Sequence, residues 1–313
     1  MADSPLSANG NAGETAGRPR LDFTVGYHAV VYLDLLGQRA RLAELRRLPA
    51  TEEERVKVGQ VLSQTAIVVM GIRNAFRKYF EIAATPGPEV VDSIPEDRRD
   101  EFLRLRTITA RQHGFSDSFV VSVPLIEQNE TALLVAAANL AATLYAVAGI
   151  QLVSLANGHP LRGGIEVGTG VEIYGQEYYG EALANAYRLE SEVAQYPRIL
   201  VGASVADYLH YLESKAHQNA AVGAAVLRSV AMSRELITLA PDDGLPMVDF
   251  LGPLMIRMAG PLVASNGVRC AEFVKTQLHR FLAERNATLA SRYGRLALYL
   301  NPSLAQRSAA TVV

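Results

Sequence analysis

The sequence predicts an α+β fold, in which helices pack against a sheet rich in antiparallel strands. The tight turn Gly114-Phe115-Ser116-Asp117 joins two segments of alternating hydrophobicity, which predicts a hairpin. Strand-like runs and helical segments follow in the order strand, two helices, hairpin, helix, hairpin, helix, strand. Because hairpins make neighbouring strands antiparallel, this order argues against a doubly wound parallel sheet.

Each element is predicted from its local pattern. The first strand ends abruptly at Asp34, and Thr51 with Glu53 and Glu54 forms a capping pattern before a long helical segment. Thr85-Pro86-Gly87-Pro88 breaks that helix and opens a loop that reaches residue 100. The predicted strands are 21–36, 105–112, 118–123, 161–167, 171–174 and 199–202, and the predicted helices are 39–48, 51–83, 131–156 and 181–194.

Three regions are expected along the chain. Residues 1–20 are small and polar, with no apolar run behind a basic start, so they predict a disordered tail and no secretory signal. Residues 21–205 hold the predicted sheet and form one domain. Residues 206–313 are expected to be a mostly helical extension, with helices at 206–239 and 269–292 around a segment rich in Pro, Gly and Met at 244–262.

The Ala-rich segment Thr131–Ala156 carries no charged side chain and is longer than the roughly 20 residues that span a bilayer. However, it contains Asn139, Thr143 and Gln151 and few large apolar residues. This composition favours a helix buried between a sheet and a partner over one that faces lipid. A membrane location is therefore not expected.

Charge and cysteine content exclude several classes of function. Lys and Arg number 30 against 32 for Asp and Glu, so no overall basic field attracts nucleic acid or an anionic membrane. The single cysteine, Cys270, excludes an intramolecular disulfide framework and multi-cysteine zinc sites, and fits a cytoplasmic location. A bound metal is therefore expected to have oxygen ligands.

Asp34 and Asp117 each lie where a predicted strand meets a turn, within apolar sequence. A carboxylate in such surroundings is costly unless it is hydrogen-bonded or paired with a cation. On adjacent strands, the two could share divalent ions through the oxygen ligands that Mg²⁺ and Mn²⁺ prefer. From the residues alone, the alternative is that each aspartate caps its own turn.

Four motifs resemble those of class III nucleotidyl cyclases and occur in the same order. Tyr32-Leu33-Asp34-Leu35-Leu36-Gly37 is similar to their first metal-binding strand, and Gly114-Phe115-Ser116-Asp117 falls where their second metal-binding aspartate lies. Leu161-Arg162-Gly163-Gly164-Ile165-Glu166-Val167-Gly168 resembles their Arg-x-Gly-Ile-x-x-Gly strand. Gly180-Glu181-Ala182-Leu183-Ala184-Asn185-Ala186-Tyr187-Arg188-Leu189-Glu190 resembles their Gly-x-x-x-Asn-x-Ala-x-Arg helix. The particular variants are similar to the pyrimidine cyclases of bacterial antiphage defence, the Pycsar systems.

The resemblance implies a role for each candidate site residue. Two Mn²⁺ or Mg²⁺ ions would be held by Asp34, Asp117 and the carbonyl of Leu35. Arg188 would be catalytic and stabilise charge on the α-phosphate. The alternative for Arg188 is an exposed helix arginine paired with Glu190 or Glu192. The residues implied to bind substrate are Leu36, Gly37, Gln38, Arg39, His113, Glu177 and Asn185.

The base specificity is left open by hydrogen-bond counting, because His113 and Glu177 can be matched to uracil or to cytosine. Tyr32 or Tyr179 would fill the space that a purine needs. The resemblance to uridylate cyclases favours UTP, with 3′,5′-cyclic UMP and pyrophosphate as products.

The resemblance also implies a homodimer with shared interfacial active sites and a downstream effector that binds the cyclic nucleotide. No nucleic-acid partner is expected. Three alternatives stay open: a cytidylate cyclase that makes cyclic CMP, a catalytically silent cyclase-like module that binds nucleotide, and a structural oligomerisation protein. The presence of Asp34, Asp117 and Arg188 argues against the silent module, and the cost of the two aspartates argues against a structural protein.

Overall fold

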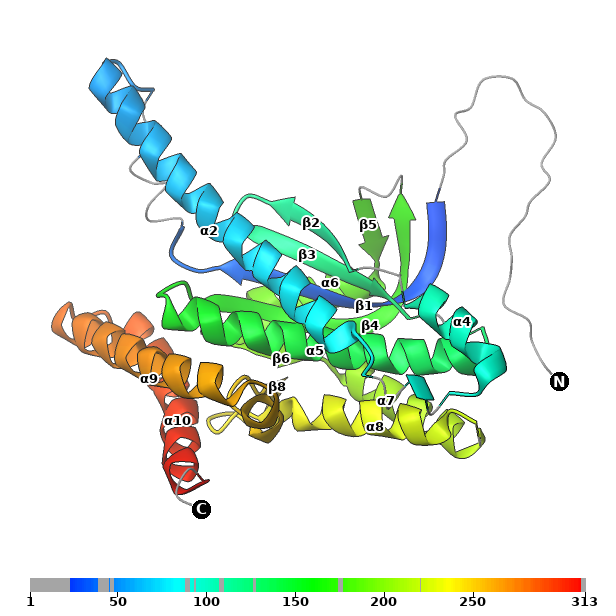
Figure 1. The fold of residues 1–313 in the computed structure, drawn as a ribbon. Coiled ribbons are helices and arrows are strands. Elements are labelled where there is room, and N and C mark those ends of the chain that lie inside the picture. The colour runs from blue at the N-terminus through cyan, green and yellow to red at the C-terminus, as the bar shows by residue number, and fades with distance from the viewer. Residues whose placement is uncertain are drawn as a thin grey trace, which may run out of the picture.

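The computed structural model describes residues 23–38, 45, 48–87, 91–92, 94–106, 110–125, 128–173, 177–219 and 221–310. Figure 1 shows how helices and strands follow one another along the chain. The predicted tail at 1–20, Arg39 and most of the predicted helix at 39–48 lie outside the described residues.

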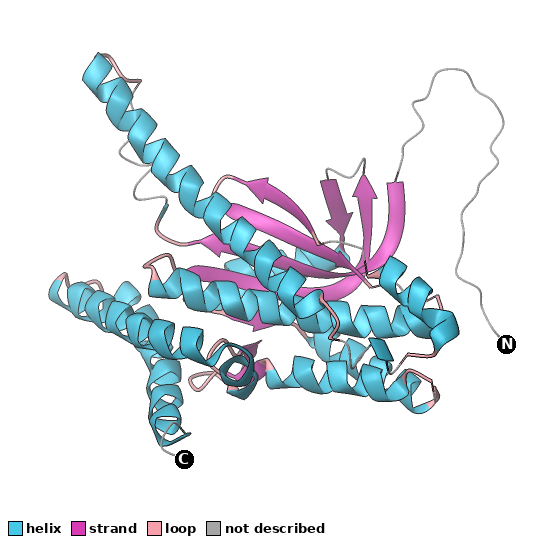
Figure 2. Ribbon diagram, viewed as in Figure 1, coloured by secondary structure: helices cyan, strands magenta, loops and turns pink. Residues whose placement is uncertain are grey.

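A sheet of eight strands forms the centre of the described part of the chain, and Figure 2 shows helices on both sides of it. Seven strands are arranged in the order β2-β3-β1-β4-β6-β8-β7, and β5 pairs with β4. All neighbours are antiparallel except β4 and β6. The α+β class predicted from the hairpin signals is therefore confirmed. The strands are β1 Phe23–Leu35, β2 Arg111–Phe115, β3 Ser118–Pro124, β4 Leu161–Ile173, β5 Glu177–Gly180, β6 Ile199–Val201, β7 Ile237–Leu239 and β8 Pro246–Val248.

The helices divide between the two faces of the sheet. On one face α5 contacts β3, β4 and β8, and α2, α4, α8 and α9 pack in turn against α5. On the other face α6 packs against β4 and β1. The helices are α2 Glu52–Ala84, α4 Glu96–Leu105, α5 Glu130–Ala156, α6 Glu181–Arg188, α7 Ala203–His217, α8 Gly223–Glu235, α9 Pro253–Ala283 and α10 Ala287–Ala310, and a π-helix, η1, spans Leu189–Ala194.

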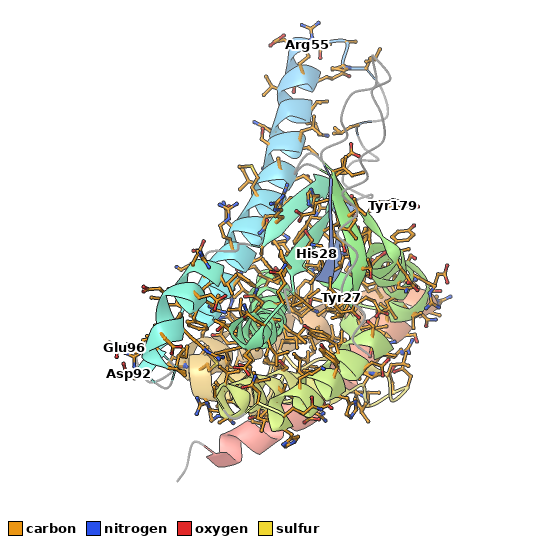
Figure 3. The ribbon with its side chains drawn as sticks, turned by 90° about the vertical axis from the view of Figure 1, so that its right-hand side faces the viewer. Tyr27, His28, Arg55, Asp92, Glu96 and Tyr179 are labelled. Carbon is orange, nitrogen blue, oxygen red and sulfur yellow. The ribbon has the colours of Figure 1, made fainter. Side chains whose placement is uncertain are left out.

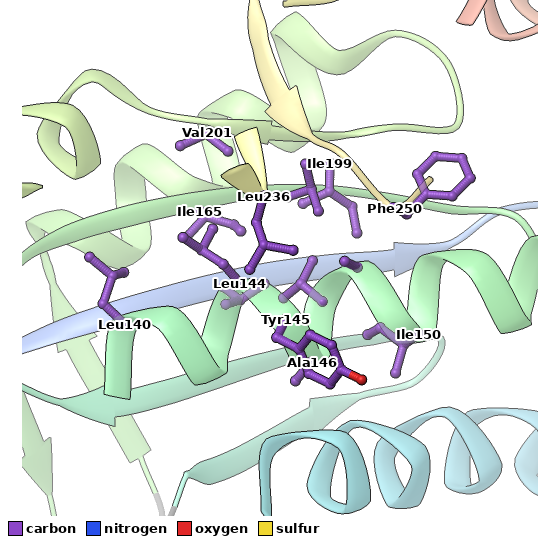
Figure 4. Packing of buried hydrophobic residues seen from close by; sticks show 14 of the residues in the cluster. Leu140, Leu144, Tyr145, Ala146, Ile150, Ile165, Ile199, Val201, Leu236 and Phe250 are labelled. Atoms are coloured by element: carbon purple, nitrogen blue, oxygen red, sulfur yellow. The ribbon is translucent and has the colours of Figure 1, made fainter. Parts of the chain in front are cut away.

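Helix α5 is the predicted Ala-rich helix, and it is buried on nearly every side. Figure 4 shows Leu140 and Leu144 of α5 facing Ile165 of the sheet, while Tyr145 points toward α2. The side chains of Asn139 and Thr143 are hydrogen-bonded inside the protein: Asn139 Nδ2 donates to the Pro124 carbonyl at 3.2 Å, and the Thr143 hydroxyl donates to the Asn139 carbonyl at 2.7 Å. The helix is long and apolar enough to cross a membrane. Its burial is that of a core helix, as its composition predicts.

Helix α2 begins where the capping pattern predicts. The Thr51 side chain accepts a hydrogen bond from the Glu54 N–H, and the Glu54 carboxylate in turn accepts one from the Thr51 N–H. The buried side chains of α2 all lie in its second half, at Val69, Ile72, Phe76 and Phe80. Its first half extends away from the rest of the protein, with Arg55 near the tip (Figures 1 and 3).

The prediction of a loop to residue 100 followed by a strand at 105–112 is wrong. Residues 96–105 form α4, whose one buried side chain is Phe102, and β2 begins only at Arg111. Pro95 begins the helix, and Glu96 and Asp97 lie in its first turn, where acidic side chains favour the helix dipole. A ten-residue helix with a single buried residue has too weak an apolar stripe to be recognised by periodicity.

Other boundaries also differ from prediction. The helix predicted at 269–292 crosses the break between α9 and α10, and α9 begins at Pro253, within the segment predicted at 244–262. The strands predicted at 161–167 and 171–174 are one strand, β4, because β1 pairs with it from Leu161 to Ile173. The helix predicted at 181–194 changes at Leu189 from α6 to η1. The segment predicted as one helix at 206–239 contains α7, α8 and β7.

The C-terminal third contributes to the sheet as well as to the helices. β8 pairs with β6, and β7 pairs with β8, so the predicted division after residue 205 separates neighbouring strands. Arg198 of the first region is fully buried and paired with Asp243, which also accepts from Arg295 of α10 at 3.0 Å. The assignment of 21–205 and 206–313 to separate domains stays a prediction.

Candidate active site

Asp34 and Asp117 lie at the same end of two neighbouring strands. The β1–β3 register places Asp34 opposite Ser118, and the Ser118 hydroxyl donates to Asp34 Oδ1 at 2.8 Å. The Leu35 N–H donates to the Asp117 carbonyl at 3.1 Å, which joins the turn before β3 to the end of β1. The structure therefore brings the two predicted metal-binding aspartates together.

The alternation of β1 sends Asp34 toward the face of the sheet that α6 covers. Val31, Leu33 and Leu35 point into the large core, whereas Tyr32 belongs to a second apolar cluster that includes Ala186 of α6. The Tyr32 ring makes an edge contact with the Tyr187 ring at 5.2 Å, and burial raises the pKa of Tyr32. The Asp34 carboxylate is 23% exposed, which leaves it accessible to a ligand.

Arg162 lies beside Asp34, a neighbour that the sequence prediction did not include in the site. It is opposite Asp34 in the β1–β4 register, and its Nη2 atom is 3.9 Å from Asp34 Oδ2. Its closer partner is Glu190 of η1, which accepts from Arg162 Nε at 2.6 Å. Glu190 is buried, and that burial raises its pKa although Arg162 opposes the shift. The Arg-x-Gly-Ile motif could have identified Arg162 as a site residue, because it places this arginine two residues before Gly164, which contacts α6.

Glycines of β4 allow α6 to lie close to the sheet. A side chain at Gly164 would overlap the Ala186 carbonyl and lie 2.6 Å from Leu189 Cβ, and one at Gly168 would lie 3.3 Å from Ala182 Cβ. The predicted cyclase-like motifs of β4 and α6 are therefore in direct contact with each other.

Arg188 is exposed at the end of α6. The structure pairs it with neither Glu190 nor Glu192, so the alternative of a paired surface arginine is wrong. Glu190 lies two residues further on, points to the other side of the helix and is held by Arg162. The charge of Arg188 acts instead on Glu166 of β4, which is buried and accepts a hydrogen bond from Ser204. Within one chain, Asp34 thus has Arg162 beside it rather than Arg188.

The turn after β1 supplies part of the predicted phosphate-binding segment. The Leu36 N–H donates to the Pro160 carbonyl at 3.0 Å, so this amide is already used within the protein. Gly37 has a φ of 90°, a conformation that favours glycine, and it is exposed. Gln38 is 2% exposed, and its Oε1 atom has no hydrogen-bond donor among the described residues. Gly37 and Gln38 remain the candidates from this segment, since Arg39 lies outside the described residues.

His113 and Glu177 are not brought together within one chain. His113 is level with Gly164 across the sheet, whereas Glu177 is opposite Ile173, nine residues further along β4 or about 30 Å of strand. Glu177 and Tyr179 alternate with the buried Tyr178, so they face away from α6. Figure 3 shows Tyr179 at the outer edge of the sheet. Asn185 is half-buried on α6, one residue before the buried Ala186.

The donor set at the strand ends suits a hard cation. Asp34 and Asp117 each carry a carboxylate, and carboxylate oxygens are among the ligands that Mg²⁺ and Mn²⁺ prefer. In the described part of the chain no group of three or more His, Cys, Asp or Glu side chains is placed to hold a metal ion. Binding at this position would therefore draw further oxygen ligands from water or from substrate phosphates, as is common for Mg²⁺.

Comparison with known proteins finds likeness in structure and none in sequence. No family model matches the chain, and no curated protein matches it. Among solved structures, the chain is similar to the adenylyl cyclase CyaB from P. aeruginosa, with 12% sequence identity and a TM-score of 0.34. The match covers 73% of this chain and 96% of that one.

Proposed function

We propose that the protein is a nucleotidyl cyclase of the class III type that converts UTP to 3′,5′-cyclic UMP and pyrophosphate. The observation that supports this most directly is the placement of Asp34 and Asp117 at one end of neighbouring strands, joined by the Leu35–Asp117 and Ser118–Asp34 hydrogen bonds. The four cyclase-like motifs of the sequence also meet on this face of the sheet.

The reaction requires the ribose 3′-hydroxyl to lose its proton and attack the α-phosphate in line, while pyrophosphate leaves. Asp34, Asp117 and the Leu35 carbonyl would hold two Mn²⁺ or Mg²⁺ ions, which when bound neutralise phosphate charge and lower the pKa of the hydroxyl. Gly37 and Gln38 would contact the terminal phosphates through their backbone N–H groups. Arg188, a permanent planar cation, would stabilise charge on the α-phosphate and the leaving oxygen.

The active site is proposed to form across a homodimer. In one chain Arg162 is the cation beside Asp34, whereas Arg188 is exposed and its charge acts on Glu166. Arg188 is therefore available to a neighbouring molecule, and a second chain would supply it to the aspartates of the first.

Base recognition is proposed to use the two subunits in the same way. His113 is in register with Val120 and Tyr32, which belong to the apolar cluster on the α6 side of the sheet, whereas Glu177 faces away from α6 and lies about 30 Å of strand further along. One base can therefore contact both only if they belong to different subunits. Glu177 would then accept from uracil N3–H while His113 donates to O4. Cytosine can be matched by the same two residues, so a cytidylate cyclase that makes cyclic CMP is the alternative. Asn185 would contact the ribose.

The cellular role follows from the resemblance to the Pycsar cyclases. The protein would act in the cytoplasm as a second-messenger synthase in antiphage defence. An effector that binds the cyclic pyrimidine nucleotide would respond to its product.

The test is to incubate the protein with UTP, CTP, ATP and GTP at equal concentration in Mn²⁺ and to identify the products by chromatography and mass spectrometry. We expect cyclic UMP and pyrophosphate to dominate. Asp34→Asn should abolish turnover, because an amide is a poor ligand for a hard cation. Asp207→Asn on the exposed surface of α7 removes the same charge far from the strand ends and should leave turnover unchanged. Near-wild-type rates in Asp34→Asn would contradict the metal-binding assignment.

A catalytically silent nucleotide-binding module is the second candidate, and one observation favours it. Arg162 places a positive charge 3.9 Å from Asp34, close to where a metal ion would bind. Calorimetric binding of UTP without any cyclic product, in both Mn²⁺ and Mg²⁺, would support this candidate over the cyclase.

A further inference from the structure

A cavity of about 380 Å³ lies on the side of α5 that faces away from the sheet. It is enclosed by the end of α2 and the residues after it, by α4, α5 and α8, and by Met258 of α9. These helices surround α5 in Figure 1. Its volume is within the range of small-molecule sites in proteins. The apolar side chains that line it include Phe102, Leu134, Ala138, Ala141, Met232 and Met258.

The cavity interrupts the burial of α5. From Thr131 to Ala156, the side chains of this helix are buried except at Ala138 and Val153. Ala138 lines this cavity, so the gap in the packing of α5 is the cavity itself. A position this apolar next to a core helix would normally be filled by side chains.

The charged lining residues are both arginines, Arg106 and Arg228, and no carboxylate lines the cavity among the described residues. Arg106 is half-buried, and its Nη1 atom makes one long hydrogen bond to Asn139 Oδ1, at 3.4 Å. Its Nε–H is buried and has no acceptor in the part of the chain that the structure describes. Arg228 is exposed at the rim. The hydroxyls of Thr85 and Ser229 already donate to backbone carbonyls.

Burial lowers the pKa of Arg106 to about 10, so the guanidinium is still protonated at neutral pH. A buried cation without a counter-charge is costly. A ligand carboxylate would remove that cost, because a guanidinium binds a carboxylate through two parallel hydrogen bonds. An apolar chain attached to it would fill the space beside Ala138 and Met232.

We propose that this cavity binds a small amphipathic carboxylate, of the medium-chain fatty-acid class, with its carboxylate on Arg106 and its apolar chain between α5 and α8. An inorganic anion would use only the arginine and leave the apolar lining unfilled. A neutral lipid would leave the Arg106 guanidinium without a charged partner among the described residues. The site is on the opposite side of α5 from the sheet and does not depend on the proposed cyclase activity.

The test is isothermal titration calorimetry of the full chain with decanoate, decan-1-ol and inorganic phosphate. We expect decanoate to bind in a one-to-one ratio and at least tenfold more tightly than decan-1-ol or phosphate. Arg106→Met should weaken decanoate binding at least tenfold. Arg104→Met removes the same charge from an exposed position on the same helix, outside the cavity, and should leave decanoate binding unchanged.

A second variant keeps the charge and removes the space. Ala138→Leu should fill the cavity and abolish decanoate binding while Arg106 is retained. Thermal unfolding without ligand is the folding control, and Arg106→Met is expected to be at least as stable as the wild type because it removes a half-buried charge that has no carboxylate partner among the described residues. If either variant fails to fold, the other decides. No decanoate binding by the wild type, equal binding of decan-1-ol, or full binding by a folded Ala138→Leu protein would overturn the proposal.

Discussion

Replacing Arg162 by methionine should destabilise the protein strongly, because it leaves Glu190 buried without its partner. The Glu190 side chain is only 4% exposed and that of Arg162 is 18% exposed, so solvent cannot replace the lost interaction. Removing one partner of such a pair typically costs about 3–5 kcal/mol. The contact of Arg162 with Asp34, at 3.9 Å, contributes much less than the 2.6 Å hydrogen bond to Glu190.

This loss should depend on pH with a defined sign. Burial raises the pKa of Glu190 in the folded protein above its unfolded value of about 4.3. A raised carboxyl pKa means that stability is fully present below the unfolded pKa and is lost as pH rises through the folded pKa. Arg162 lowers this pKa in the wild type, so Arg162→Met raises it further. The destabilisation should therefore be large at neutral pH and shrink toward pH 4.3.

The assay is urea unfolding followed by circular dichroism, for the wild type, Arg162→Met, Glu190→Leu and the double variant, at neutral pH and at about pH 5. The double variant should recover most of the stability, because a well-packed apolar pair replaces a buried ion pair at little cost. A loss below about 1 kcal/mol, or one that is the same at both pH values, would refute the assignment of Glu190 as a buried ion that depends on Arg162.

Three further results are expected. Gly164→Ala should cost about 1–3 kcal/mol of unfolding free energy because its Cβ would overlap α6. Gly71→Ala, at an exposed position of α2 with open space around it, should stabilise by roughly 0.4–1 kcal/mol. A small loss at Gly164 would contradict the close packing of α6 on β4. Mixing inactive Asp117→Ala and Arg188→Ala proteins should restore activity at one of the two interfacial sites, and a mixture that stays inactive while its subunits exchange would place the site within one chain. Glu177→Gln and His113→Ala should each weaken the preference for UTP in a competition of four nucleotides. A mixture of His113→Ala and Glu177→Gln subunits should recover the preference at one of the two interfacial sites. An unchanged product ratio in Glu177→Gln would show that this residue does not take part in base recognition.

Much of the fold could be predicted because it depends on local chemistry. The capping box at Thr51 fixed the start of α2, and the composition of 131–156 identified a buried helix. Failures occurred where tertiary contacts override local preference. The glycines of β4 are poor strand formers, yet Gly168 and Gly170 lie within one strand because β1 pairs along its whole length. The three-residue strands β7 and β8 are too short to show any alternation.

The candidate site was predictable to the extent that it depends on strand ends. Asp34 and Asp117 are each marked by a turn next to apolar sequence, and the pairing of β3 with β1 places them together. The ion pair between Arg162 and Glu190 was not predictable in this way, because the two residues are far apart in sequence and meet only once α6 lies on β4. The separation of His113 from Glu177 likewise depends on how far β4 continues before β5 turns back.

Because a π-helix follows α6, this part of the fold is sensitive to the insertion or deletion of a single residue. In η1 the backbone bonds to the fifth residue along instead of the fourth, so Leu189–Ala194 contains more residues per turn than α6 does. Deleting one residue at the start of η1 would let α6 continue as a regular helix and would move Glu190 into the position of Leu189, about 100° back around the helix axis. A deletion just before Glu190 would then turn this carboxylate away from Arg162 without changing a single side chain of the pair. Insertions and deletions between Gly180 and Gln195 should therefore be tolerated much less well than substitutions at the same exposed positions.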